Sequence, residues 1–165
     1  MNIKTTIDGF HIKYAEETDV PIILDYIKQL AKYENELEYV EADEKTLHES
    51  LFEKKAAEVI LGIYNNRNVG FAVFHRNFST FLGKPGINLV DLYIEPEMRN
   101  NGFGKEMLLY LAKITIEHNC GRLEWWVHDW NTDAQRFYKR IGSKEVEQIR
   151  VYRLTGNELH EFAGL

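Results

Sequence analysis

The chain is poor in cysteine and in proline. Its 165 residues include one cysteine, Cys120, and three prolines. A single thiol excludes an intrachain disulfide, so packing must hold the fold together. Cys120 lies near the end of an apolar-periodic segment. We expect a small core residue there rather than a reactive thiol, because free cysteine is commonly buried.

Long apolar runs are also missing. No run approaches the roughly 20 apolar residues that cross a bilayer. The first ten residues lack the charged start and the apolar stretch of a signal peptide. We therefore expect a cytoplasmic protein with no membrane partner.

Positive charge is in deficit, and the net charge is −6. This balance disfavours nucleic acid as the main partner and is compatible with a cationic substrate. The six histidines show no metal-ligand spacing such as His-Glu-x-x-His. We predict that the protein binds no nucleic acid and no metal.

The composition that remains is that of a globular protein. Hydrophobic residues make up 44% of the chain and charged residues 28%. A chain of this length buries enough surface to fold without disulfides or a structural metal. Because no linker or internal repeat interrupts the sequence, we expect one domain over residues 1–165.

Hydrophobic periodicity predicts an interleaved set of strands and helices. Strands are expected at residues 10–15, 58–64, 68–75, 87–94, 122–127 and 144–154, the last as one strand or two. Helices are expected at residues 18–31, 44–55, 102–118 and 132–140, with a short helix at the carboxyl end. The strand at 87–94 is nearly continuous in apolar residues, so both of its faces should be buried. The order describes a mixed α/β domain.

A glycine-bearing helix start follows that strand. Pro96 breaks the strand, and Gly102 and Gly104 lie between Arg99 and Lys105. Glycine lets backbone N–H groups approach an anion closely, and a helix N-terminus favours negative charge. The two basic side chains add positive charge nearby. The loop therefore predicts a cradle for a phosphate or pyrophosphate.

Two common phosphate loops do not fit this stretch. A P-loop would need glycine at the position of Arg99 and Ser or Thr at the position of Glu106. A dinucleotide fingerprint needs three glycines after an early strand, and only two are present here, late in the chain. By itself the loop is equally consistent with a helix start that holds no ligand.

Two blocks of sequence together resemble the signatures of the GNAT acetyltransferase superfamily. The first is Arg99-x-x-Gly102-x-Gly104, and the second runs over residues 131–142 with an Asn-rich helix start, Phe-Tyr and a glycine. One predicted helix and one predicted strand separate them, in the order of the superfamily. The resemblance implies a mixed α+β fold with a central, mostly antiparallel sheet flanked by helices. It also implies acetyl-CoA as co-substrate.

Further segments are similar to the diamine (spermidine/spermine) acetyltransferase branch, over most of the chain from about Ile12 onward. They are Leu30–Glu34, Gly70–Ala72, Gly83–Lys84, Asp129–Asn131 and Phe137–Arg140. Members of this branch are homodimers, and some act on thialysine or related amines. The resemblance therefore implies a homodimer and leaves the acceptor open.

The same resemblance implies where the cofactor lies. The backbone of Leu92, Tyr93 and Ile94 is implied to bind the pantetheine arm as a strand would, with an N–H near Tyr93 donating to the thioester oxygen. The residues implied to hold the pyrophosphate are Arg99, Asn100, Asn101, Gly102, Phe103, Gly104 and Lys105. Asn131, Ala134 and Tyr138 are implied to contact the cofactor from the second block.

Tyr138 matches the family's catalytic tyrosine, which protonates the departing thiolate. From the residues alone it has a second interpretation, because Ala134, Phe137, Tyr138 and Ile141 form a helical stripe typical of core packing. We expect the acid role when the motif is taken into account.

The general base stays open. The branch carries a glutamate just before a strand aspartate, whereas Val90 precedes Asp91 here. Strand alternation predicts that Asp91 points away from the face of Val90. Glu34, His128 and Asp129 are other candidates, as is a chain of water molecules.

Tyr33 and Glu34 match the Tyr-Glu pair with which the branch binds its amine. The acidic residues that follow, up to Glu44, either attract a polycation or form a solvated loop. The expected reaction is direct attack by a neutral amine on the thioester of acetyl-CoA, with a small primary amine such as a polyamine or diamine as acceptor.

Other acceptors stay open, namely a thialysine- or lysine-like amino acid, an aminoglycoside or a protein amine. A different class is a non-catalytic acyl-CoA-binding sensor.

Overall fold

A six-stranded sheet forms the frame of the first of two compact units, which meet in the sequence between Trp126 and Val127. The structure is a computed structural model and describes residues 2–165. In sheet order the strands are β1 (Asn2–Lys4), β2 (Phe10–Tyr14), β3 (Glu58–Tyr64), β4 (Arg67–Ser79), β5 (Lys84–Ile94) and β6 (Leu123–Trp125). Neighbours from β1 to β5 are antiparallel, and β6 is parallel to β5.

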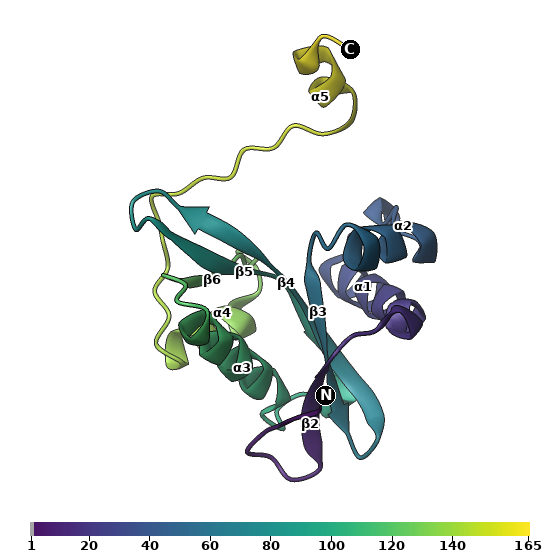
Figure 1. Cartoon of the computed structure of the whole chain (residues 1–165), viewed down its shortest axis with the longest axis vertical. Coiled ribbons are helices and arrows are strands. Elements are labelled where there is room, and N and C mark those ends of the chain that lie inside the picture. The colour runs from purple at the N-terminus through teal and green to yellow at the C-terminus, as the bar shows by residue number, and fades with distance from the viewer. Residues whose placement is uncertain (1) are drawn as a thin grey trace. The chain divides into compact units, whose positions relative to one another are not determined.

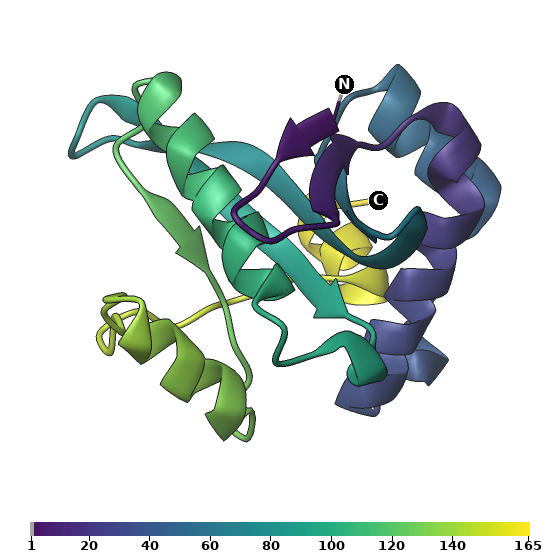
Figure 2. The same cartoon turned by 90° about the horizontal axis from the view of Figure 1, so that it is seen from below.

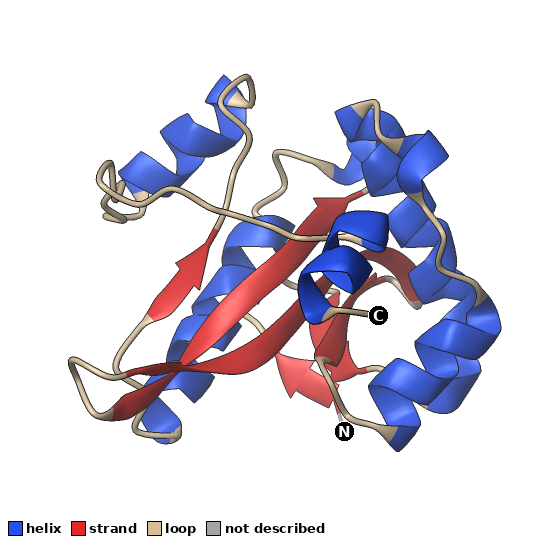
Figure 3. Ribbon diagram, turned by 90° about the horizontal axis from the view of Figure 1, so that it is seen from above, coloured by secondary structure: helices blue, strands red, loops and turns tan. Residues whose placement is uncertain are grey.

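Helices cover both faces of this sheet. The long helices are α1 (Val20–Glu34) and α3 (Phe103–Glu117), and α2 (Glu44–His48) is short. Further short helical segments are η1 (Glu17–Asp19), η2 (Leu37–Tyr39), η3 (Glu49–Glu53) and η4 (Pro96–Met98). Figure 1 shows α1 and α2 on one side of the sheet and α3 on the other. The strands, red in Figure 3, thus lie between helical layers, which confirms the predicted mixed α+β architecture.

The apolar stripes of the helices explain this layering. On the α1 face, Ile23 and Tyr26 are fully buried against Leu61 and Phe71 of the sheet. On the α3 face, the ring of Phe103 stacks on that of Phe10 with centroids 4.3 Å apart. Burying apolar surface on each face is the main term that stabilises such a layered domain.

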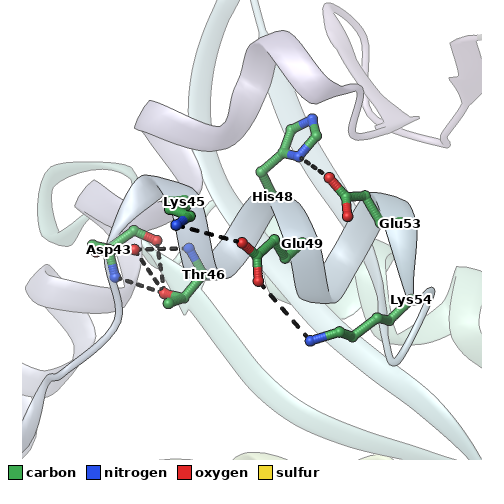
Figure 4. A network of polar contacts seen from close by, with 7 residues as sticks. All are labelled: Asp43, Lys45, Thr46, His48, Glu49, Glu53 and Lys54. Atoms are coloured by element: carbon green, nitrogen blue, oxygen red, sulfur yellow. Dashed lines mark hydrogen bonds and ion pairs between the residues drawn. The ribbon is translucent and has the colours of Figure 1, made fainter.

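A polar network caps the start of the helical segment that begins with α2 and forms ion pairs on its surface. The Asp43 side chain accepts a hydrogen bond from Thr46 N at 2.7 Å, so it caps the first turn (Figure 4). Glu49 lies 4.0 Å from Lys45 and from Lys54, on the continuation of the helix into η3. The predicted helix over 44–55 is therefore present, with its last turn wound as a π-helix.

The second unit holds α4 (Thr132–Arg140) and α5 (Gly156–Ala163). Both were predicted, but the strand expected over 144–154 is wrong, because none of these residues forms a strand in the structure. A strand needs a neighbour for its N–H and C=O groups, and the alternating pattern of this segment has none within the unit. Its apolar side chains Val146, Ile149, Val151 and Tyr152 lie exposed.

Other expectations differ in smaller ways. The short strand β1 was not predicted, because three residues carry too little periodicity to detect. The hairpin of β4 and β5 runs farther than expected, to Ser79 and back from Lys84. Cys120 is only half-buried. Over residues 2–165 no helix combines the length and apolar character that a membrane crossing requires.

Candidate active site

The chain between β5 and α3 forms a tight loop, which Figure 2 shows between the end of the β5 arrow and the first turn of α3. Asn100 and Gly102 adopt positive φ values of 63° and 85°. Asparagine and glycine are the residues that tolerate this region best. The side-chain amide of Asn101 donates to the carbonyl oxygens of Met98 and Arg99, both at 3.1 Å. The loop is thus held by its own side chains in one conformation.

The first turn of α3 presents its backbone donors without a side-chain cap. Gly102 is the N-cap residue and has no side chain to accept a hydrogen bond from the turn. The N–H groups of the first turn have no partner within a helix, and the helix dipole adds partial positive charge there. Lys105 lies exposed in the same turn. This arrangement suits an anion.

Gly104, in the same turn, leaves the backbone open to the close approach of a ligand. Its φ is not in the left-handed region, so its backbone conformation does not require glycine. A Cβ placed on Gly104 would meet only the Cγ1 of Ile94 among the described residues, at an ordinary 3.7 Å. Neither conformation nor packing within the chain requires glycine here. The missing Cβ leaves the backbone open to a group that approaches from outside, which is compatible with a pyrophosphate.

The side chain of Arg99 turns inward from this loop. Its Nε donates to the carbonyl oxygen of Ile94 at 3.0 Å. Its guanidinium carbon lies 4.7 Å from the ring centroid of Tyr33 and 5.6 Å from that of Tyr93. Arg99 therefore connects the loop with the end of β5 and with the last turn of α1.

A second set of polar contacts supports the base of the loop. Glu95 accepts a hydrogen bond from the hydroxyl of Tyr26 at 3.2 Å and pairs with Arg67. Arg67 also reaches Glu97 at 3.2 Å. Burial raises the pKa of Tyr26, and the neighbouring Glu95 adds to the shift. No sequence pattern identified these residues, because they come from α1, β4 and the loop and meet only in the folded sheet.

A β-bulge at Val90 interrupts the regular pairing of β5 directly before its acidic residue, Asp91. Val73 is paired with Asp91 and Phe74 with Leu89, so Val90 is the extra residue of β5. Directly opposite residues share a face of the sheet, which places Asp91 on the α1 face with Val73. Val90 itself is 51% exposed. The expectation that the strand is buried on both faces is therefore wrong at the bulge.

Asp91 and Glu34 form an acidic pair on this face. Glu34 is the last residue of α1, and it is half-buried like Asp91. Burial raises the pKa of the Asp91 carboxyl to about 6, and the negative charge of Glu34 contributes to the rise. A carboxyl group with such a pKa is ionised at neutral pH and can still accept a proton readily.

The first unit thus brings together most of the predicted site residues. The strand end of Leu92–Ile94, the loop of Asn100–Lys105, and Tyr33 and Glu34 lie around one end of β5 and α1. Their roles as ligands of cofactor or amine stay predictions.

The second unit carries the remaining predicted residues. Asn131 caps α4, and its Oδ1 accepts from the N–H of Ala134 at 3.2 Å. Tyr138 lies half-buried two turns along the helix, and burial raises the pKa of its hydroxyl. Ser143 donates to the carbonyl oxygen of Tyr138 at 2.8 Å. Tyr138 therefore stays protonated at neutral pH, as a proton donor must; its catalytic role stays a prediction.

The chain belongs to the acetyltransferase (GNAT) family, whose model matches residues 24–142. This match confirms the resemblance of the two signature blocks. The family uses acetyl-CoA as co-substrate, and the protein is an acetyl-transfer enzyme.

Curated relatives lie close to the predicted branch. The chain is 30% identical to a thialysine N-epsilon-acetyltransferase of Bos taurus, over 93% of this chain and 96% of the relative. It is 39% identical to L-ornithine N5-acetyltransferase NATA1 of Arabidopsis thaliana, over 54% of this chain and 40% of that protein. Identity to the human spermidine/spermine N(1)-acetyltransferase-like protein 1 is 29%, over 97% of this chain and 24% of that protein. The chain thus spans less than half of the length of the last two.

Solved structures confirm the fold. An integron cassette protein from the mobile metagenome of V. cholerae superposes with a TM-score of 0.79 and 26% identity. The match covers 94% of this chain and 98% of that one.

Proposed function

We propose that the protein transfers the acetyl group of acetyl-CoA to one amino group of a small acceptor that carries two. The observation that carries this proposal is the Asp91–Glu34 pair beside the predicted cofactor strand. Two carboxylates close to one another attract a cation such as an alkylammonium group. The acceptors named for the three relatives are thialysine, ornithine and spermidine or spermine. All of them have at least two amino groups on a short chain, so one ammonium can bind while the other group reacts.

The co-substrate is proposed to lie on the first unit. The backbone of Leu92–Ile94 binds the pantetheine arm, and the N–H groups of residues 100–105 bind the pyrophosphate. Asn131 and Ala134 contribute from the second block. Neither packing nor backbone conformation requires glycine at position 104, and its missing Cβ leaves room for the pyrophosphate, which supports this placement.

The chemistry requires the nitrogen to lose two protons and the sulfur to gain one. An alkylammonium has a pKa near ~10.4 and must lose a proton before its nitrogen can attack the thioester carbon. Asp91, ionised above pH 6, accepts that proton directly or through water. Attack forms the C–N bond, the C–S bond then breaks, and the sulfur takes a proton from the hydroxyl of Tyr138. The acetylated nitrogen gives its second proton to water, and the Tyr138 phenolate takes a proton back from solvent. Bound acetyl-CoA supplies the electrophilic carbonyl carbon and the leaving thiolate.

A thiol-release assay tests the proposal. Acetyl-CoA is offered with ornithine, thialysine, putrescine, spermidine, an aminoglycoside and a basic peptide, for the wild type and for Tyr138→Phe. Turnover of one of the first four acceptors, lowered about 100-fold or more in Tyr138→Phe, supports the proposal. Turnover of only the aminoglycoside or the peptide corrects the acceptor. Binding of acetyl-CoA without turnover of any amine supports a sensor instead.

We also propose that the enzyme acts in the cytoplasm as a homodimer. The one thiol of the chain, Cys120, suits a reducing compartment. The exposed apolar side chains of residues 144–154 offer surface that a second copy would cover. Sedimentation of the purified protein measures the dimer directly.

A further inference from the structure

Arg99 is one of the two basic residues that the sequence predicted beside the phosphates, with Lys105, and its side chain contacts other parts of the site. The guanidinium contacts the rings of Tyr33 and Tyr93, and Nε is bonded to the carbonyl oxygen of Ile94. These contacts hold the guanidinium on the side of α1 and β5. Backbone N–H groups and Lys105 already supply positive potential at that place.

The three partners of Arg99 belong to parts of the site with different tasks. The Ile94 carbonyl belongs to the strand end proposed for pantetheine. Tyr93 is anchored from the side of α1, because its hydroxyl donates to Gln29 Oε1 at 2.8 Å. Tyr33 lies in the last turn of α1, next to Glu34 of the proposed amine site. Arg99 is thus the side chain through which the glycine loop contacts the acceptor end of α1.

Arg99 also precedes the strained part of the loop. The next residue, Asn100, has a φ of 63°, and Gly102 follows at 85°. A displacement of Arg99 therefore shifts the backbone donors that follow it directly. Positioning errors of about 1 Å in a binding site are enough to cost much of its affinity or rate.

We propose that Arg99 is a positioning residue that couples the two substrate sites: its stacking on Tyr33 holds the pyrophosphate loop in its binding conformation. This inference rests on the proposed function, because it takes the loop as the acetyl-CoA site. It assigns Tyr33 an effect on CoA affinity even though Tyr33 lies on α1, outside the loop. A cation–π contact at a partly exposed site contributes about 0.5–1 kcal/mol and a desolvated one about 2 or more, which corresponds to roughly twofold to thirtyfold in affinity.

The first test is a double-mutant cycle read out by CoA binding in calorimetry, and the KM for the amine is then measured for Arg99→Gln. The variants are Arg99→Gln, Tyr33→Leu and the double variant, all in the full chain. We expect Tyr33→Leu to weaken CoA binding about threefold to tenfold. In the Arg99→Gln background the same change should have an effect below twofold.

Matched controls separate stacking from general damage. Tyr33→Phe keeps the ring and should bind CoA within twofold of the wild type. Tyr39→Leu removes a ring that is 73% exposed in η2 and should leave CoA affinity unchanged. Arg122→Gln removes a guanidinium that pairs with Glu124 on the surface and should do the same. Thermal melts confirm that each variant is folded.

The outcomes are distinct. Independent, multiplying effects of the two substitutions, or an unchanged CoA affinity in Tyr33→Leu, would overturn the coupling while leaving the proposed function intact. A wild-type protein that binds no CoA would overturn both. Coupled effects together with a raised KM for the amine in Arg99→Gln support the inference, since a phosphate ligand alone would leave that KM unchanged.

Discussion

Asp91 on β5 and Glu34 at the end of α1 place their carboxyl groups within electrostatic reach on one face of the sheet. Burial first and the charge of Glu34 second raise the pKa of Asp91 to about 6. Asp91 is paired with Val73, which packs on the face that α1 covers, so strand pairing brings Asp91 to the side of the sheet where α1 ends in Glu34. A proposed base is thereby placed beside a proposed cation site.

The pH dependence of catalysis should report this pair. If Asp91 accepts the proton of the amine, kcat/KM falls below pH 6, about tenfold per pH unit once Asp91 is protonated. Glu34→Gln removes the like charge, so the acid limb should move to lower pH. The pH profiles of the wild type and Glu34→Gln, measured with one acceptor, check this. An acid limb at the same pH in both would show that another group titrates.

Stability should respond to Asp91 in the opposite sense to activity. Its folded pKa of about 6 exceeds the ordinary aspartate pKa of 3.8, so the folded state binds more protons between these two pH values. The stabilising contribution of Asp91 to the free energy of unfolding is therefore complete below pH 3.8 and is lost as the pH rises through 6. Asp91→Asn, which cannot ionise, should raise the free energy of unfolding at pH 8 by up to about 3 kcal/mol.

Urea unfolding at pH 4 and pH 8 measures this difference. The wild type should lose stability relative to Asp91→Asn between the two values. Equal behaviour of the two proteins would mean that the Asp91 carboxyl is well solvated.

Gly104→Ala should separate ligand binding from folding. The chain leaves room for a Cβ, with Ile94 at 3.7 Å, and alanine is the better helix former by about 0.5–1 kcal/mol. The variant should be as stable as the wild type or more so, while CoA affinity falls about tenfold because the Cβ occupies the path of the pyrophosphate. Calorimetry and a thermal melt give both quantities. Unchanged affinity would place the pyrophosphate elsewhere.

Gly102→Ala makes the matched comparison. Gly102 has a φ of 85°, which an L-residue adopts at a cost of about 1–2 kcal/mol. This variant should therefore lose stability as well as affinity. The pair of substitutions distinguishes a glycine required by conformation from one required by a ligand.

Glu106 links the amino-terminal turn to the start of α3. Its buried carboxylate accepts hydrogen bonds from both the backbone N–H of Thr6, at 3.2 Å, and the hydroxyl of Thr6. Glu106→Ala leaves these donors without their acceptor and should lower the free energy of unfolding by about 1–3 kcal/mol. Denaturant titration measures the loss, with Glu117→Ala on the exposed end of α3 as control. A loss equal to that of the control would show that water replaces the carboxylate.

Local patterns were sufficient for most helices and strands. The apolar stripe of α1, the glycine pair at the start of α3 and the helical pattern of residues 132–140 are all local features. The predicted bounds of these three helices therefore agree closely with the structure. The segment 144–154 has an equally clear alternation and is not a strand. Alternation describes which side chains share a face, whereas a strand also needs a partner for its backbone.

The amino-acid sequence by itself determined the family, the glycine-bearing start of α3 and the position of α4 with Tyr138, because these depend on residue types at short spacing. Tertiary structure alone decided the bulge at Val90, the inward turn of Arg99 and the support of Glu95 by Tyr26. The bulge at Val90 comes from pairing between strands, and the contacts of Arg99 join residues that only the packing of α1 on the sheet brings together. Such contacts depend on register and packing between distant segments, which no local period of the sequence encodes.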